Sequence, residues 1–210
     1  MDPATWIAFV AASTALLLIP GPTVLLVLAY ALSKGKRIAV PTALGVATGD
    51  LIAMTASLAG LGALVLTSAT LFTLLKWMGA AYLVWLGLKM ILGAKESRLN
   101  LPQAKGELAP RAAFGNAAAV TALNPKSIMF FVAFVPQFIT AEAPFLPQAT
   151  ILIATFVALA GVNALAYALL ADRLRATIRR PAVMQWVTRV GGGTLLAMGA
   201  ATATLRRASA

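Results

Sequence analysis

Long apolar runs, separated by short polar or charged segments, follow one another along the whole chain. A helix needs about 20 apolar residues, at about 1.5 Å per residue, to cross about 30 Å of hydrocarbon. Runs that reach this length predict six membrane-spanning helices, over about residues 5–32, 40–66, 70–92, 113–135, 147–170 and 183–205. The pattern therefore predicts an all-α integral membrane protein with a single transmembrane domain, residues 1–210.

The composition agrees with this interpretation. Hydrophobic residues make up 60% of the chain and charged residues 11%, with a mean hydropathy of +0.88. Soluble domains have about 45–50% apolar and about 25% charged residues. The start of the chain lacks the basic segment of a secretory signal, and its apolar run continues past Tyr30 without a convincing cleavage site, so we expect it to be retained as the first span.

The position of the charges predicts the topology. Seventeen basic residues oppose six acidic ones, a net charge of +11. The connections at 66–71 and 136–147 hold no basic residue, and Arg206 and Arg207 at the C-terminus oppose the trend only locally. The positive-inside rule then places loops 1, 3 and 5 in the cytoplasm and both termini outside. The charge is explained in this way without a nucleic-acid partner. The basic residues of these loops are Lys34, Lys36 and Arg37; Lys89, Lys95, Arg98, Lys105 and Arg111; and Arg173, Arg175, Arg179, Arg180 and Arg189.

Two of the predicted spans are interrupted halfway, about half the chain apart. The first contains Pro20-Gly21-Pro22 and the fourth Asn124-Pro125-Lys126. A weaker internal similarity relates the third and sixth spans, where Gly79-x3-Leu83-x3-Gly87 resembles Gly191-x3-Leu195-x3-Gly199. These internal similarities predict two three-helix halves, about 1–92 and 113–210, joined by a cytoplasmic linker at about 93–112. An odd number of spans per half makes the two repeats inverted.

The interruptions predict a binding site. A proline inside a helix removes a backbone hydrogen bond, and in hydrocarbon the freed carbonyl must be covered by protein or by a water-filled cavity. A proline kink without function is the alternative. Paired breaks at matching depth favour a substrate site near the midplane, where half-helix N-termini face an anion and freed carbonyls face a cation. We expect Thr23 and Ser127, each directly after its break, to satisfy freed carbonyls locally.

Two charged side chains, Lys126 and Asp50, lie deep inside the predicted spans. Lys126 is about eleven residues, or about 16 Å, from either end of its span, too far to snorkel to the surface. Asp50 is the only acid well inside a span. One reading is a buried ion pair that holds the halves together. In the other, Lys126 and the amides of the broken helices hold a carboxylate while Asp50 meets an ammonium group or exchanges a proton. The two readings can also be successive states of one cycle.

The remaining candidates are weaker. Gly45 and Gly49 permit close helix approach, for which packing is the stronger explanation. Asn163 and Tyr167, one turn apart in the fifth span, either line a cavity or bond neighbouring helices. The chain has no cysteine and no histidine, which excludes disulfides, Cys/His metal sites and imidazole catalysis, and we predict no metal and no cofactor.

Together these motifs resemble the amino-acid exporters named for lysine export and for resistance to homoserine and threonine, over nearly the whole chain. The motifs are Pro20-Gly21-Pro22, Gly45-x3-Gly49-Asp50, Lys76-Trp77-x-Gly79-Ala80-Ala81-Tyr82-Leu83-x-Trp85-Leu86-Gly87, Asn124-Pro125-Lys126-Ser127 and Pro136-Gln137-Phe138. The resemblance implies a six-helix carrier of the bacterial inner membrane that moves amino acids or close derivatives outward, driven by the proton gradient.

The predicted function is therefore a secondary transporter that works by alternating access of two inverted halves. Its substrate site would comprise Pro20, Gly21, Pro22, Asn124, Pro125, Lys126, Gly45, Gly49, Asn163 and Tyr167, with Asp50 as the proton or cation partner. A membrane-embedded enzyme is disfavoured, because the chain has no Ser/His/Asp set and no carboxylate pair. The alternatives are a structural or channel-like subunit and an exporter of another solute. Besides its substrate, protons and membrane lipid are the expected partners, and a homodimer is left open.

Overall fold

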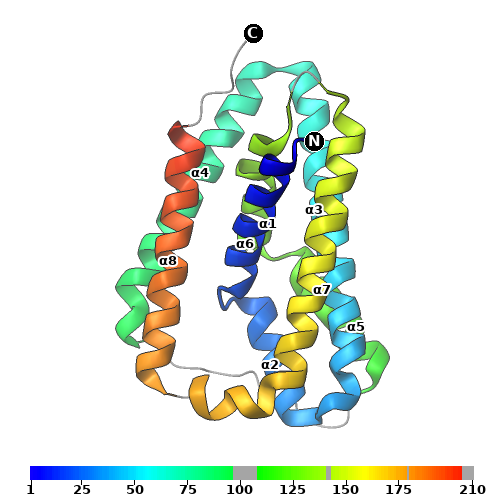
Figure 1. The fold of residues 1–210 in the computed structure, drawn as a ribbon, viewed down its shortest axis with the longest axis vertical. Helices are drawn as coiled ribbons and strands as arrows, with labels where there is room; N and C mark the ends of the chain where they lie inside the picture. Colours follow the sequence, from blue (N-terminus) through cyan, green and yellow to red (C-terminus); the bar gives the residue numbers. More distant parts are fainter. Residues whose placement is uncertain (97–107, 141–142, 179, 205–210) are drawn as a thin grey trace.

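A computed structural model describes residues 1–96, 108–140, 143–178 and 180–204, and every element within these ranges is helical (Figure 1). The all-α prediction is confirmed. The elements in chain order are α1 (Pro3–Leu18), α2 (Pro22–Lys34), η1 (Lys36–Ile38), α3 (Ala39–Thr67), α4 (Ala69–Leu92), η2 (Gly93–Glu96), α5 (Pro110–Ala122), α6 (Pro125–Ala133), η3 (Val135–Phe138), α7 (Phe145–Ile178) and α8 (Pro181–Thr204).

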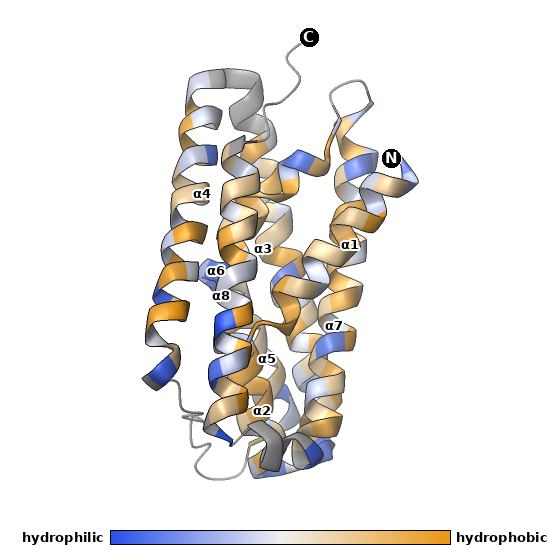
Figure 2. Cartoon of the chain, turned by 60° about the vertical axis from the view of Figure 1, so that its left-hand side comes forward, coloured by the Kyte–Doolittle hydropathy of each residue, from blue (hydrophilic) through white to orange (hydrophobic). Residues whose placement is uncertain are grey.

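The helices run along the long axis of one bundle (Figure 1). The connection from α2 to α3, the end of α4 and the start of α8 lie at one end, which holds Lys34, Lys36, Arg37, Lys95 and Arg180 and is called the basic end. The N-terminus, the turn from α3 to α4 and the last turn of α8 lie at the opposite end. Alternate connections are thus grouped at one end, and Figure 2 shows hydrophobic residues along most of the helix lengths.

Three to five segments of the described chain are long and apolar enough to cross a membrane, depending on whether each bent helix pair counts as one span. Three are single helices, over Lys36–Gly62, Thr73–Lys95 and Phe145–Ala171, and the bent pairs α1–α2 and α5–α6 bring the number up to five. The expected sixth span, α8, is not among them. Its first half carries several polar residues, including Arg189, which lower its hydropathy. It nevertheless packs along α4 (Figures 1 and 2), with which it makes extensive contact.

The two predicted breaks are confirmed. The axes of α1 and α2 differ by 57°, and those of α5 and the segment Pro125–Phe138 by 47°. Both α2 and α6 begin with a proline, at a position where the missing backbone N–H costs nothing and the fixed φ suits a helix. A proline also disfavours helical backbone in the residue before it: Pro20 acts in this way on Ile19, where α1 ends, and Pro125 on Asn124, just after α5.

Glycines allow two helix pairs to approach closely. A Cβ atom at Gly49 of α3 would lie 2.7 Å from the Cβ atom of Thr121 in α5, and one at Gly45 would overlap the carbonyl oxygen of Phe114. On the other side of the bundle, a Cβ atom at Gly87 of α4 would lie 2.6 Å from the carbonyl oxygen of Gly192 in α8. These positions need glycine because backbone meets backbone there.

Six phenylalanines fill the bundle between the breaks and the opposite end, and we call them the aromatic cluster. Phe131 and Phe156 meet edge to face at 4.8 Å between ring centroids, and Phe9 and Phe138 do so at 5.3 Å. Phe9, Phe131 and Phe156 are completely buried. The cluster therefore closes the inside of the bundle on that side of the breaks. Its members are Phe9, Phe130, Phe131, Phe134, Phe138 and Phe156.

Candidate functional site

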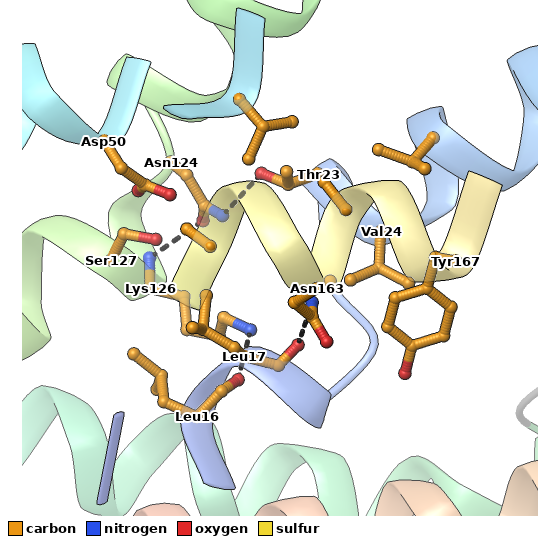
Figure 3. A pocket seen from close by; sticks show the side chains of 15 residues that line it. Leu16, Leu17, Thr23, Val24, Asp50, Asn124, Lys126, Ser127, Asn163 and Tyr167 are labelled. Atoms are coloured by element: carbon orange, nitrogen blue, oxygen red, sulfur yellow. Dashed lines mark hydrogen bonds between the residues drawn. The ribbon is translucent and has the colours of Figure 1, made fainter. Parts of the chain in front are cut away.

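The two broken helices meet at a small polar cavity, shown in Figure 3. Its volume is about 30 Å³, room for about one water molecule. Residues from α1, α2, α3, α6 and α7 line it, so five separate helices contribute to one site. The polar side chains in its wall are those of Thr23, Asp50, Asn124, Lys126, Ser127, Asn163 and Tyr167.

Lys126 and two residues of α7 cap the end of α1. The Lys126 ammonium group donates to the carbonyl oxygens of Leu16, at 3.1 Å, and Ile19, at 2.9 Å. The Asn163 amide donates to the carbonyl of Leu17, and the Tyr167 hydroxyl to that of Leu18, both at 3.2 Å. Side chains from other helices therefore bond four successive carbonyls at the end of α1, and the Leu16 carbonyl also accepts from the Ile19 N–H at 3.2 Å.

The contacts at the end of α1 resolve two alternatives left by the sequence and identify a cation at the break. Asn163 and Tyr167 line the small cavity and also bond a neighbouring helix, so the two alternatives hold together. The freed carbonyls do face a cation, and this cation is the chain's own Lys126. The C-terminal end of a helix dipole is negative and favours an ammonium group at this place. Lys126 is only 9% exposed, so water stabilises its charge little.

Asn124 joins the two breaks. Its side-chain oxygen accepts a hydrogen bond from the backbone N–H of Lys126 at 3.1 Å, which caps α6. Its amide donates to the hydroxyl of Thr23 in the first turn of α2 at 3.2 Å. Thr23 also shares a hydrogen bond with the Thr121 hydroxyl at 3.3 Å. The expectation that Thr23 satisfies carbonyls of its own helix is wrong, because its hydroxyl instead links the two broken helices.

Asp50 enters the small cavity from α3. It is 2% exposed, and its Oδ1 atom has no hydrogen-bond partner in the part of the chain that the structure describes. Asp50 and Lys126 are close enough to attract each other electrostatically, but the Lys126 ammonium is directed to α1 (Figure 3). The direct Asp50–Lys126 ion pair, one of the two hypotheses from the sequence, is therefore not formed in this structure. A buried carboxyl group with one unpartnered oxygen is suited to receive a proton or an ammonium group.

A second, larger cavity lies beside the breaks, toward α4 and α8. Its volume of about 330 Å³ is near the lower end of the range for small-molecule pockets, about 300 to 1,000 Å³. It shares Gly21, Asn124 and Lys126 with the small cavity. Its wall also contains Pro20, Pro22 and Pro125 of the breaks, together with Leu25, Tyr82, Leu86, Met90, Met184 and Thr188.

The structure brings most of the predicted site residues together, with two exceptions. Gly45 and Gly49 line neither of the two cavities. They lie at the contact between α3 and α5, which supports the packing explanation. The part of the larger cavity formed by α4 and α8 was not predicted. The spacing Tyr82-x3-Leu86-x3-Met90, which puts three side chains on one helix face, was the available signal.

Apolar helices around two broken helices, with buried charged side chains where the breaks meet, define a membrane transporter. Residues 14–205 match the LysE type translocator family, and the chain belongs to this family. The resemblance drawn from the motifs is thereby confirmed.

Similar proteins include three bacterial membrane proteins. The chain is 36% identical to the homoserine/homoserine lactone efflux protein of Salmonella typhimurium, over 97% of this chain and 98% of that protein. It is 33% identical to an uncharacterized membrane protein of Vibrio cholerae, over 98% and 100%. It is 32% identical to the leucine efflux protein of Klebsiella pneumoniae, over 66% and 65%. No solved structure matches the chain significantly.

Proposed function

We propose that this protein exports an amino acid or a small amino-acid derivative from the bacterial cytoplasm, as a secondary transporter driven by the proton gradient. The observation that carries the proposal is the meeting of the two broken helices around Lys126 and Asp50, beside a cavity of about 330 Å³. Relatives that are named as efflux proteins for homoserine and for leucine support an amino-acid substrate.

The proposed membrane arrangement has six spans in two inverted halves, with α8 as the sixth. Two features support it. The broken pair α1–α2 runs toward the basic end, whereas α5–α6 runs away from it (Figure 1). The basic residues of the alternate connections that the structure describes gather at one end, which the positive-inside rule places in the cytoplasm of the inner membrane. Both termini then lie outside.

In this arrangement the described conformation faces the cytoplasm. The larger cavity reaches from the breaks toward the basic end, since its α4 and α8 residues, Tyr82 to Met90 and Met184 to Thr188, belong to the halves of these helices nearest that end. The aromatic cluster fills the opposite side. Alternating access then requires the cluster to open and the cavity to close, and the two bends are the places where α1–α2 and α5–α6 can pivot.

The substrate carboxylate is proposed to compete with the carbonyls of Leu16 and Ile19 for the Lys126 ammonium group. Its partners would be the ammonium group and the free N–H groups at the start of α2, where Gly21 offers no side-chain cap. Asp50 would receive the substrate ammonium group or a proton. When a carboxylate takes Lys126 away, the Ile19 carbonyl loses its donor and the Leu16 carbonyl keeps only the bond from the Ile19 N–H, so binding weakens the cap that fixes α1. This competition couples substrate binding to the position of the first broken helix.

An export panel tests the proposed function. Cells are loaded with dipeptides, and the extrusion of each released amino acid is compared between the wild-type protein and an empty vector. We expect selective extrusion of one or a few amino acids above the vector. A structural or channel-like subunit would show no selective, saturable extrusion at equal membrane insertion, and this outcome would overturn the proposal.

Cysteine labelling tests the orientation and alternating access, and the natural absence of cysteine gives a clean background. An impermeant maleimide is expected to label Lys36→Cys only from the cytoplasmic side and Ala4→Cys only from the outside, since both positions are exposed at opposite ends. Met90→Cys, in the larger cavity, should react from the cytoplasmic side and more slowly with saturating substrate. Labelling of Lys36→Cys from the outside would reverse the topology, and equal labelling of Met90→Cys from both sides would contradict alternating access.

A further inference from the structure

The part of the larger cavity away from the breaks is built from α4 and α8. Its wall there combines the apolar side chains of Leu86, Met90 and Met184 with the hydroxyl-bearing side chains of Tyr82 and Thr188. Lys126, at the breaks, is the one charged residue in the described lining. A substrate whose carboxylate binds Lys126 therefore finds no counter-charge for a charged side chain, and burying an unpaired charge is costly.

Thr188 differs from other threonines in the helices. Thr42, Thr194 and Thr202 donate their hydroxyls to the carbonyls one turn earlier, at 2.7, 3.0 and 2.9 Å. The Thr188 residue is 8% exposed, and its hydroxyl makes no hydrogen bond within the described ranges of the chain, where the buried atoms without a partner are Ser13 Oγ, Asp50 Oδ1 and Gln137 Oε1. The Thr188 oxygen is therefore accessible from the cavity. Such a hydroxyl has no protein partner to give up, so it can exchange a hydrogen bond with water for one with a ligand. Because Thr188 lines the cavity, this ligand would sit inside it.

We infer that Thr188 is a specificity-determining residue that hydrogen-bonds a hydroxyl on the side chain of a neutral transported amino acid. This inference rests on the proposed export function. With the carboxylate at Lys126, the substrate side chain lies against the wall formed by α4 and α8. The substrate hydroxyl donates to, or accepts from, the Thr188 hydroxyl, while its methylene groups contact Leu86 and Met184. The free phenol of Tyr82 lies in the same wall and offers a second partner.

The test is Thr188→Val, which replaces the hydroxyl by a methyl group of similar size. Export of homoserine is compared with that of norvaline, in which a methyl group stands in place of the hydroxyl. We expect the variant to lower the ratio of homoserine to norvaline export by about five-fold, the effect of one neutral hydrogen bond. Thr194→Val, on the same helix, is the matched control, since its hydroxyl bonds Val190 instead of facing the cavity. It should leave the ratio unchanged.

Thr188→Ser keeps the hydroxyl and separates recognition from packing. It is expected to preserve the wild-type ratio, and a loss of preference in this variant would show that shape, not the hydroxyl, decides. An unchanged ratio in Thr188→Val with export intact would overturn the inference and leave the proposed function standing. The absence of export of any amino acid by the wild-type protein would instead overturn the proposed function and the inference with it. Preferential export of lysine or glutamate would overturn the inference of a neutral substrate and leave the proposed export function standing.

Discussion

Asp50→Asn is expected to reduce gradient-driven export to the level of the empty vector while the membrane-inserted amount stays near that of the wild-type protein. Asparagine has nearly the same shape as aspartate but can neither exchange a proton nor pair with an ammonium group as an anion. Asp50 is buried in α3 against the small cavity, with Oδ1 unpartnered, so no described hydrogen bond of that atom is lost. The measurement is the efflux rate from loaded cells, normalised to the inserted protein.

Two controls separate the possible roles of Asp50. Asp2→Asn changes an acid that caps α1 at the surface, and it should export normally because asparagine also caps helices well. Exchange of internal for external substrate in proteoliposomes needs no net proton movement. If Asp50 carries the proton, Asp50→Asn should retain exchange and lose only gradient-driven export. If Asp50 binds the substrate ammonium group, both should be lost. Normal gradient-driven export in this variant would remove Asp50 from the mechanism.

The positions of the breaks could be predicted because proline acts locally. Pro20 ends α1 and Pro22 starts α2, while Pro125 acts at both places in the other pair, wherever the segment lies in the fold. The burial of Lys126 was predictable for a similar reason, since its distance from both ends of the span follows from the sequence. That the two breaks also contact each other, through Asn124 and Thr23, was suggested by their matching depth and is seen in the structure.

The partners of these residues could not be predicted, because they depend on which helices become neighbours. The sequence suggested Asp50 or a substrate carboxylate as the partner of Lys126, but the bend of α1 brings the carbonyls of Leu16 and Ile19 within reach of its ammonium group. Thr188 was missed because a polar residue near the start of the last span resembles an ordinary residue at the membrane surface. Its neighbours across the cavity lie about a hundred positions earlier in the chain, in α4.

Gly45 and Gly49, which were predicted to belong to the site, pack against α5 and line neither cavity. They stand in the same motif as Asp50, and this proximity in sequence led to their assignment to the site. Successive helix residues point in different directions, so only part of a motif can face a given cavity. Asp50 faces the cavity, whereas the two glycines face α5, where a side chain would collide with the backbone. The motif Gly45-x3-Gly49-Asp50 therefore contains one residue that faces the cavity and two glycines that pack α3 against α5.

Replacement of Lys126 should have the other large effect. Lys126→Ala is expected to weaken substrate binding by about 3 kcal/mol, more than about 100-fold in Kd, because it removes a buried charged partner of the carboxylate. Lys126→Met retains most of the apolar stem and should lose binding to a similar extent. Binding is measured by calorimetry on purified protein in detergent, and the thermal unfolding midpoint is recorded alongside it.

The unfolding midpoint distinguishes the binding role from a structural one. Both variants remove the ammonium donor, but the Leu16 carbonyl keeps the bond from the Ile19 N–H and lies beside a cavity where water can replace the ammonium group. We therefore expect a smaller loss of stability than of binding. Lys89→Ala, which removes an exposed ammonium group located over the Trp85 ring, is the matched control and should bind substrate normally. Parallel loss of binding and folding in Lys126→Ala and Lys126→Met would assign this lysine to holding α1, and recognition of the carboxylate would then fall to the start of α2 alone.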